Sequence, residues 1–81
     1  MSKGYAVYDS QKNQLQVVRP NETTKRYISC TNFRPNQDQV FGVEVHGDEI
    51  WLLVGPLNNQ RPNRKIIYRF SSLSGGGSAG L

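Results

Sequence analysis

Few side chains of this sequence are of the types that commonly do chemistry. The chain has one cysteine, Cys30, and one histidine, His46, so an intrachain disulfide is impossible and a zinc site would need ligands from other chains. Asp48 and Glu49 are adjacent carboxylates, but neighbouring residues of a strand or turn point apart and do not suggest a shared proton. The glycines at 75–77 lack the lysine and the following helix of a phosphate-binding loop. The sequence therefore predicts a protein that is not an enzyme and has no cofactor and no metal.

Cys30 and His46 each allow a structural and a functional interpretation. Nothing near Cys30 in the sequence would lower the pKa of its thiol, which favours a small buried hydrophobic residue over a reactive thiol. His46 stands beside a predicted turn and shares the outer face of a strand with Glu44, which favours a solvated residue at the end of that strand. We expect neither residue to be catalytic.

The stretch Gln39–Gly55 shows the clearest hydrophobic periodicity in the chain and is typical of a β-hairpin. In its first arm, Phe41, Val43 and Val45 alternate with more polar or smaller residues and are expected on one face. In its second arm, every second residue from 50 to 54 is aliphatic. Gly47-Asp48 lies between the arms, and glycine allows the positive φ of a two-residue turn.

Four further runs have the composition of strands, and no segment combines a capping residue with helical spacing. They are Tyr5–Tyr8, Leu15–Val18, Arg26–Thr31 and Lys65–Phe70. We therefore predict an all-β fold, a small six-strand antiparallel barrel or sandwich built from hairpins, with one domain over residues 1–70. Residues 71–81 are rich in glycine and serine and are expected to be a flexible tail.

Length and composition favour a partner and an intracellular setting. A chain of 81 residues leaves much of its surface exposed, and without a disulfide or metal the remaining way to stabilise it is oligomerisation. The N-terminal MSKGYAVYD has no apolar segment of signal-peptide length, and no run is long enough to span a membrane. We expect a cytoplasmic protein or one that is assembled into a virion, without membrane contact.

Basic residues are expected to concentrate at one end of the fold. The tripeptide Arg-Pro-Asn occurs at 19–21, 34–36 and 61–63, where it favours tight turns or the presentation of arginines to an acidic partner. If the six strands run up and down, the loops 9–14, 32–38 and 56–64 share one end, which has a net charge of +3 when the strand-edge Lys65 is included. The loops 19–25 and 46–49 share the other end, which is neutral when the strand-edge Arg26 is included. The candidate contacts for an acidic partner or a nucleic acid are Lys12, Arg34, Arg61, Arg64 and Lys65.

The last two strands are apolar on both faces, which is the strongest functional signal of the sequence. Trp51 and Leu53 lie opposite the Ile50 face of their strand, and Ile67 lies opposite Ile66, so one face is left for a partner to cover. The predicted protein interface consists of Trp51, Leu53, Ile67 and Arg69.

The segments VFGVEVHGDEIWLLVG and KIIYRF together resemble a kelch-like β-propeller blade, and GYAVYDSQKNQLQVV is similar to the outer hairpin of such a blade. The kelch double glycine is absent, because Gly55 is followed by Pro56. One chain has too few strands for a closed propeller. The resemblance implies a blade contributed within an oligomer, and we expect the barrel or sandwich in preference to it.

Two functions remain open from the sequence. The first is a non-enzymatic structural or protein-interaction module that forms a homo-oligomer or part of a larger particle, a role frequent among bacteriophage virion components. The second is a small nucleic-acid-binding β-barrel in which Tyr5, Tyr8, Tyr27 or Phe33 stacks on bases while the basic loops contact phosphates.

Overall fold

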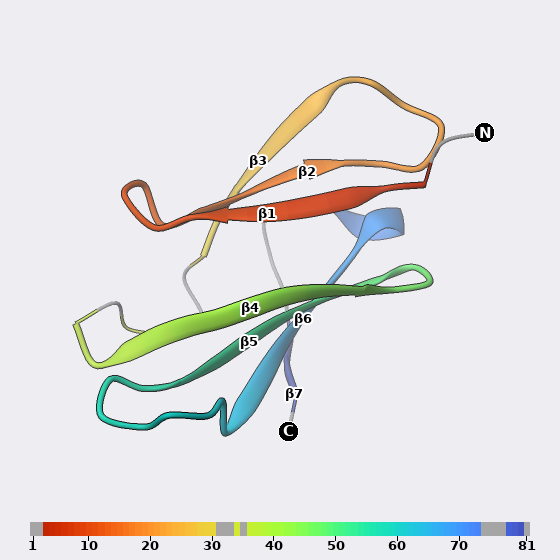
Figure 1. Ribbon diagram of the computed structural model, residues 1–81. Coiled ribbons are helices and arrows are strands. Elements are labelled where there is room, and N and C mark those ends of the chain that lie inside the picture. The colour runs from red at the N-terminus through yellow and green to blue at the C-terminus, as the bar shows by residue number, and fades with distance from the viewer. Residues whose placement is uncertain (1–2, 31–33, 35, 74–77, 81) are drawn as a thin grey trace.

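The chain folds into β-strands connected by turns and short loops. The computed structural model describes residues 3–30, 34, 36–73 and 78–80. Figure 1 shows the elements in chain order: β1 (Tyr5–Asp9), β2 (Gln14–Val18), β3 (Lys25–Ser29), β4 (Asp38–His46), β5 (Glu49–Pro56), β6 (Arg64–Arg69), the 3-10 turn η1 (Phe70–Ser72) and β7 (Ser78–Gly80). The all-β prediction is confirmed, and the six predicted strands are all present.

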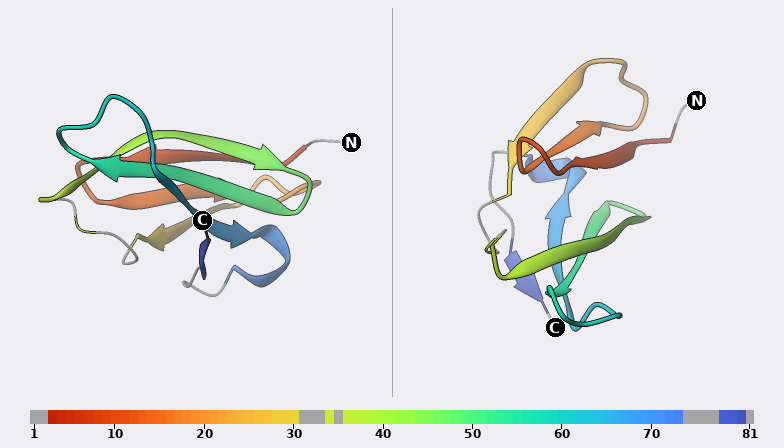
Figure 2. Two further views of the ribbon diagram at one scale, coloured as in Figure 1. Left: turned by 90° about the horizontal axis from the view of Figure 1, so that it is seen from below. Right: turned by 60° about the vertical axis from the view of Figure 1, so that its left-hand side comes forward.

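The strands form two antiparallel sheets. The N-terminal sheet has the order β1-β2-β3, and the C-terminal sheet has the order β4-β5-β6-β7. Figures 1 and 2 show the two sheets as layers that face each other. Within the part of the chain that the structure describes, no strand is hydrogen-bonded to strands of both sheets, so these strands do not close into a barrel.

One hydrophobic core lies between the two layers. Successive side chains of a strand point to opposite faces, so alternate residues of each strand enter the core. Its buried members come from both sheets and from η1: Leu15, Val17, Ile28, Cys30, Ile50, Leu52, Val54, Ile66, Tyr68 and Phe70. Burial of an aliphatic side chain of this size contributes about 1.5–3 kcal/mol, so this core holds the layers together.

The predicted hairpin over Gln39–Gly55 is formed by β4 and β5. His46 pairs with Glu49, which leaves a two-residue turn between the strands. Gly47 has a φ of 61°, and Asp48 is not in the positive-φ region. A positive φ at the first turn position alone is the pattern of a type II′ turn, where glycine avoids the steric penalty of a side chain. The predicted role of this glycine is therefore confirmed.

A bulge in β4 changes the face that Phe41 occupies. The register between β4 and β5 shifts at this residue. A bulge places one extra residue in a strand and interrupts the alternation of faces. Val43 packs against the core, but the ring of Phe41 lies over Gly55, 3.2 Å from the position that a Cβ would take there. The predicted common face of Phe41, Val43 and Val45 is therefore wrong at Phe41.

The first Arg-Pro-Asn tripeptide forms the predicted tight turn. The amide of Glu22 donates to the carbonyl of Arg19 over 3.1 Å. Asn21 has a φ of 64°. Proline at the second position and a residue with positive φ at the third are the features of a type II turn.

The other two tripeptides differ from each other. The amide of Gln37 donates to the carbonyl of Arg34 over 2.9 Å, so this segment also turns, although Pro35 lies outside the described residues. In the third tripeptide the amide of Asn63 donates to the carbonyl of Val54 over 3.0 Å. The third copy therefore serves the junction between the loop and the C-terminal sheet and not an isolated turn.

Asn13 ties the N-terminal sheet together at one end. It has a φ of 50°, which asparagine tolerates better than most residues. Its Oδ1 accepts a hydrogen bond from the hydroxyl of Tyr8 at 2.5 Å, and its Nδ2 donates to the carbonyl of Cys30 at 2.6 Å. The amide of Cys30 donates to the carbonyl of Asn13 at 2.9 Å. One residue therefore joins β1 to the end of β3.

The turns lie at the two ends that an up-and-down order predicts. In Figure 1 the turn at 10–13, the segment 36–38 and the loop 57–63 are on the left, while the loop 19–24 and the turn 47–48 are on the right. The amide of Leu57 donates to the carbonyl of Gln37 over 3.0 Å, which joins two of the loops at the first end.

The tail predicted over residues 71–81 makes contacts with the rest of the chain where it is described. Ser71 and Ser72 belong to η1, and Leu73 packs partly against the core. Ser78–Gly80 forms β7, which pairs with residues 65–67 of β6. Residues 74–77 and 81 lie outside the described part of the chain. The flexibility of the tail stays a prediction.

The stretches that carry the kelch-like resemblance fall into different sheets. β4, β5 and β6 are neighbours in the C-terminal sheet, as in a blade. The stretch GYAVYDSQKNQLQVV forms the β1–β2 hairpin of the N-terminal sheet and not an outer hairpin of the same sheet. The resemblance stays a prediction.

Candidate interaction surface

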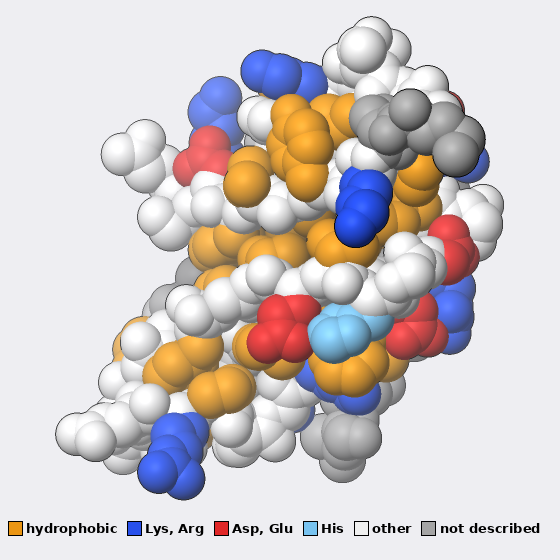
Figure 3. All heavy atoms as spheres, turned by 45° about the vertical axis from the view of Figure 1, so that its right-hand side comes forward, with side chains coloured by type: hydrophobic (Ala, Val, Ile, Leu, Met, Phe, Trp, Pro, Cys, Tyr) orange, Lys and Arg blue, Asp and Glu red, His pale blue; other side chains and the backbone are white. Residues whose placement is uncertain are grey.

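The outer face of the C-terminal sheet is covered by charged and aromatic side chains. The outward-facing residues of its three long strands are Glu44 and His46 on β4, Glu49, Trp51 and Leu53 on β5, and Lys65, Ile67 and Arg69 on β6. In Figure 3 the single histidine lies between acidic side chains, with hydrophobic surface next to it.

Trp51 is covered by its own chain. The His46 ring stacks on it with a centroid distance of 4.0 Å, and the Lys65 ammonium lies 3.5 Å from the ring centroid. The indole Nε1 donates to a carboxylate oxygen of Glu49 at 2.9 Å. A cation over an indole contributes about 0.5–1 kcal/mol at an exposed site. The strands on both sides of β5 therefore supply contacts that the sequence analysis expected from a partner.

A shallow open hollow of about 320 Å³ lies beside this tryptophan. It is lined by Glu44, Trp51, Leu53, Pro62, Arg64 and Lys65. Gly42 pairs with Leu53 and has no side chain to cover it. The hollow is therefore a gap in the outer layer and carries charges of both signs.

The predicted interface residues do share one face, but little of their apolar surface is open. Trp51, Leu53 and Ile67 are half-buried, and Trp51 lies directly opposite Ile67. Arg69 is exposed and its guanidinium lies 2.9 Å from a carboxylate oxygen of Glu49. Hydrogen bonding to Trp51 and the charge of Arg69 lower the pKa of Glu49. Whether these four residues contact a partner stays a prediction.

The five basic residues predicted to contact an acidic partner or a nucleic acid differ in their surroundings. Lys12, Arg34 and Arg61 are exposed, as an acidic partner would require. Lys65 lies over the Trp51 ring instead of extending from the loop end.

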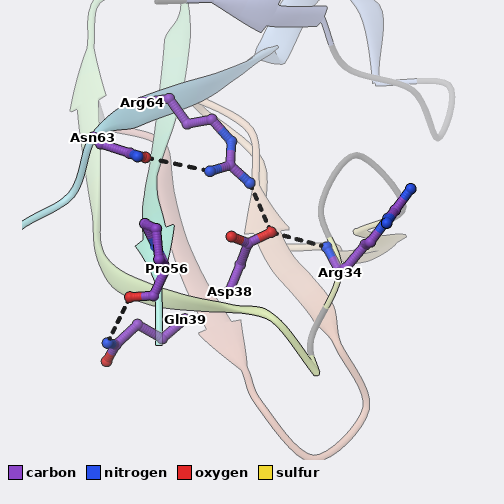
Figure 4. A network of polar contacts seen from close by, with 6 residues as sticks. All are labelled: Arg34, Asp38, Gln39, Pro56, Asn63 and Arg64. Atoms are coloured by element: carbon purple, nitrogen blue, oxygen red, sulfur yellow. Dashed lines mark hydrogen bonds and ion pairs between the residues drawn. The ribbon is translucent and has the colours of Figure 1, made fainter. Parts of the chain in front are cut away.

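Arg64 is held in a polar network that links three segments (Figure 4). Its guanidinium lies 2.7 Å from a carboxylate oxygen of Asp38 and contacts the side-chain oxygen of Asn63 at 3.3 Å. The hydrogen bond from Arg64 lowers the pKa of Asp38. Beside this network, the side chain of Gln39 donates separately to the carbonyls of Pro56 and Leu57, which joins β4 to the end of β5. Arg64 therefore serves the fold at the junction of β4 and β6.

The outer face of the N-terminal sheet is a second exposed surface, which the sequence predicts only through the stacking candidates Tyr5 and Tyr27. Five large apolar side chains are exposed in the described part of the chain, and three of them, Tyr5, Val7 and Tyr27, lie on this face, with exposures of 44, 49 and 60 %. Val7 and Tyr27 flank the same residue of β2, Gln16. We call Tyr5, Val7 and Tyr27 the tyrosine face. The alternation of Tyr5 and Val7 with Ala6 and Tyr8 was a signal, but it could not tell which side meets the core.

Positive charge accompanies the tyrosine face. The N-terminal sheet and its loops, residues 3–29, contain five Lys or Arg and two Asp or Glu, a net charge of +3. Residues 38–73, which include most of the C-terminal sheet, contain four of each and are neutral. The excess positive charge therefore lies in the N-terminal sheet as well as at the loop end that the sequence predicted.

The side chains that could take part in chemistry make structural contacts. Asp48 accepts hydrogen bonds from the amide and the hydroxyl of Ser71, which fixes η1. Cys30 is 1 % exposed, as predicted, and burial raises the pKa of its thiol. His46 lies 2.8 Å from a carboxylate oxygen of Glu44.

The described residues contain no group of three or more His, Cys, Asp or Glu side chains placed to hold a metal ion. In the same ranges, no helix has the length and apolar character to cross a lipid bilayer.

Comparisons of the chain with known protein families, with curated proteins and with solved structures give no match. The surfaces described above are therefore the basis for assigning a role.

Proposed function

We propose that this chain is a non-enzymatic structural module that self-assembles through its N-terminal sheet, either as a homo-oligomer or within a larger particle such as a virion. The observation that carries the proposal is the tyrosine face. Tyr5, Val7 and Tyr27 are all more than two-fifths exposed, although other apolar side chains of the same sheet are fully buried. Tyrosine is enriched among the residues that anchor protein interfaces, because its ring is large and its hydroxyl tolerates water.

The proposed scaffold for this role is a two-layer sandwich. Residues of both sheets share one core, and no ladder of the described strands joins the sheets. Each layer therefore uses one face for the core and has a second face available for contacts. The second face of the C-terminal sheet is occupied by the stack of His46 and Lys65 on Trp51, which leaves the N-terminal sheet as the more open one.

A nucleic-acid partner is the second candidate, because the tyrosine face and the excess positive charge belong to the same layer. Tyr5 and Tyr27 are exposed on a face whose edge strand also carries the exposed Lys25 and Arg26. Stacking on aromatic rings and contacts with phosphates are the usual means of binding single strands. Arg26 lies 3.6 Å from a carboxylate oxygen of Glu22, which reduces the charge available to phosphates. We therefore favour the protein partner.

Light scattering on the full chain at increasing micromolar concentrations tests the proposal. We expect a mass above that of the 9.1 kDa chain. Replacing Val7 and Tyr27 together by threonine keeps β-propensity and removes apolar surface, and should weaken association by about tenfold or more, since interface anchors contribute over 1 kcal/mol each. A mass of one chain at every concentration would overturn the proposal.

Leu57→Ser provides the matched control. Leu57 is 54 % exposed, similar to the tyrosine face, but it lies in the loop after β5. We expect this variant to associate like the unchanged protein. Equal weakening by both variants would indicate a general effect of surface hydrophobicity and contradict docking through the N-terminal sheet.

Fluorescence anisotropy with a labelled single-stranded oligonucleotide separates the two candidates. Tight binding that weakens steeply with salt and is lost in the threonine variant would favour the nucleic-acid partner. Absence of binding at low salt removes that candidate and leaves the assembly module.

A further inference from the structure

One edge of the N-terminal sheet is open along a whole strand. β3 is the last strand of that sheet and pairs only with β2 among the described strands. Four of its five residues are exposed, and the exception is the core residue Ile28. Figure 2 shows β3, drawn in yellow, at the border of its layer. An unpaired strand edge is a template for pairing with another strand.

The register with β2 identifies the backbone groups that face outward. In an antiparallel pair, residues alternate between exchanging both hydrogen bonds with the neighbour and exchanging none. The Cys30 amide donates to the Asn13 carbonyl, which assigns Cys30, and with it Ile28 and Arg26, to the bonded class. The amides and carbonyls of Lys25, Tyr27 and Ser29 therefore point away from β2 toward the open edge.

From this geometry we infer that β3 pairs with β3 of a second copy of the chain, antiparallel and with the two-fold axis at Tyr27. This inference rests on the proposed self-assembly and names its contact. In this register Tyr27 lies opposite Tyr27 of the partner subunit, and Lys25 lies opposite Ser29 of the partner subunit. The outward amides and carbonyls of all three residues then have partners.

Other symmetric registers are less favourable. An axis at Lys25 places two lysines opposite each other, and an axis at Arg26 opposes two arginines and leaves Ser29 unpaired. Like charges directly opposite each other across a strand pair are destabilising. An axis at Ile28 leaves the outward groups of Lys25 without partners, and an axis at Ser29 pairs that residue alone. Only the axis at Tyr27 pairs every outward group and avoids like charges.

The dimer would also extend the proposed docking surface. Pairing at β3 joins the two N-terminal sheets into one continuous sheet, with both tyrosine faces on the same side. The Tyr27 rings become direct cross-strand neighbours, an arrangement in which aromatic side chains stabilise a strand pair. Tyr27 is the most exposed of the large apolar residues in the described part of the chain, which is the residue that this contact would cover.

Charge substitutions at Ser29 test the register in opposite directions. Ser29 is exposed and its side chain points away from the core, so both variants should fold. Ser29→Glu places a carboxylate opposite Lys25 of the partner subunit, twice per dimer, and Ser29→Lys places an ammonium there. The energies of cross-strand charge pairs predict that Ser29→Glu lowers the dissociation constant of the dimer about two- to thirtyfold and that Ser29→Lys raises it by a similar factor. Dissociation constants that shift in the same direction would overturn the inference.

Disulfide trapping tests the axis directly. Residues of a hydrogen-bonded antiparallel pair have Cα atoms about 5.5 Å apart, within the range of a disulfide. Tyr27→Cys should therefore form a covalent dimer on mild oxidation of the folded protein. The matched control is Lys25→Cys, because the two residues at this position are about 13 Å apart along the strands and should not cross-link. A mixture of Lys25→Cys and Ser29→Cys chains should cross-link as a heterodimer.

The outcomes separate the inference from the proposed function. A protein that assembles by light scattering but whose Tyr27→Cys variant cross-links no better than Lys25→Cys overturns the two-fold axis and leaves self-assembly intact. A mass of one chain at every concentration overturns self-assembly itself. Native Cys30 is 1 % exposed in the fold, and denaturation in the presence of excess alkylating reagent blocks its thiol as it becomes accessible, which keeps it out of the readout.

Discussion

Replacing Tyr68 by phenylalanine removes a hydroxyl that the fold buries without a full hydrogen-bond partner. Tyr68 is 1 % exposed, and no nitrogen or oxygen of the described residues bonds its hydroxyl, which lies near the Cys30 thiol. A thiol is a weak hydrogen-bonding group, and a buried polar group without a partner costs about 1–3 kcal/mol. Burial raises the pKa of this phenol well above its ordinary value. Since the lost hydroxyl leaves a small void, we expect Tyr68→Phe to raise the free energy of unfolding by about 1 kcal/mol.

Tyr8→Phe is the matched control with the opposite expected sign. Its hydroxyl donates to the Oδ1 of Asn13 at 2.5 Å, and Asn13 also bonds the backbone of Cys30. Removing one atom here breaks a hydrogen bond whose net contribution is about 0.5–1.5 kcal/mol. We therefore expect Tyr8→Phe to lower the free energy of unfolding by about 1 kcal/mol, although the chemical change is the same as at Tyr68.

Urea and thermal unfolding at one fixed protein concentration measure both variants, because association makes the apparent stability depend on concentration. For a domain of this size, 1 kcal/mol corresponds to a shift in Tm of roughly 4–8 °C. Tyr68→Phe should unfold later and Tyr8→Phe earlier than the unchanged protein. A loss of 1 kcal/mol or more in Tyr68→Phe would refute the reasoning, because it would mean that the hydroxyl has a strong partner.

Three further predictions concern a turn, an ion pair and the thiol. At both Gly47 and Gly42 an added Cβ meets nothing within 4 Å, so only the backbone conformation distinguishes the two positions. Gly47→Ala should destabilise the fold by about 1–2 kcal/mol because Gly47 has a φ of 61°, whereas Gly42→Ala should be tolerated. Equal losses in unfolding experiments would contradict this. The hydrogen bond from Arg64 lowers the pKa of Asp38 in the folded protein. The ionised carboxylate therefore stabilises the fold fully above the ordinary pKa of 3.8, and this stabilisation is lost as the pH falls through the lowered pKa of the folded state. Asp38→Asn should therefore lower the urea midpoint at neutral pH but not in strong acid, and an equal loss at both would refute the pairing. Burial raises the pKa of the Cys30 thiol, so a thiol reagent should modify it only as fast as the protein unfolds, and rapid labelling of the folded protein would contradict this.

The hairpin and turn signals could be read from the sequence because they are local. Gly47 takes the positive φ that its position in a two-residue turn requires, and Asn21 does so after a proline. Inward residues such as Leu52 follow from the two-residue alternation of a strand. The bulge at Phe41 could not be predicted, because it depends on how β4 and β5 align and on the space over Gly55.

The predicted interface shows where the sequence was insufficient. Both faces of β5 are apolar, so the sequence correctly set Trp51 and Leu53 apart from the core face. It could not show that His46 and Lys65, far apart in the chain, would both lie against Trp51. Arg64 likewise looked available for a partner until the fold placed it beside Asp38.

By itself, the sequence determined the strands β1 to β6, the turns at Gly47 and Asn21 and most of the alternation that fills the core, because alternation and turn chemistry act over a few neighbouring residues. It did not predict β7, which lies in the segment expected to be a tail. Only the tertiary structure decided which faces stay open, because that depends on how the two layers pack and which distant side chains meet. It left Tyr5, Val7 and Tyr27 exposed on the positively charged sheet and gave Trp51 partners from its own chain. Among the described strands, β3 pairs with β2 alone, which leaves open the edge on which the proposed dimer rests.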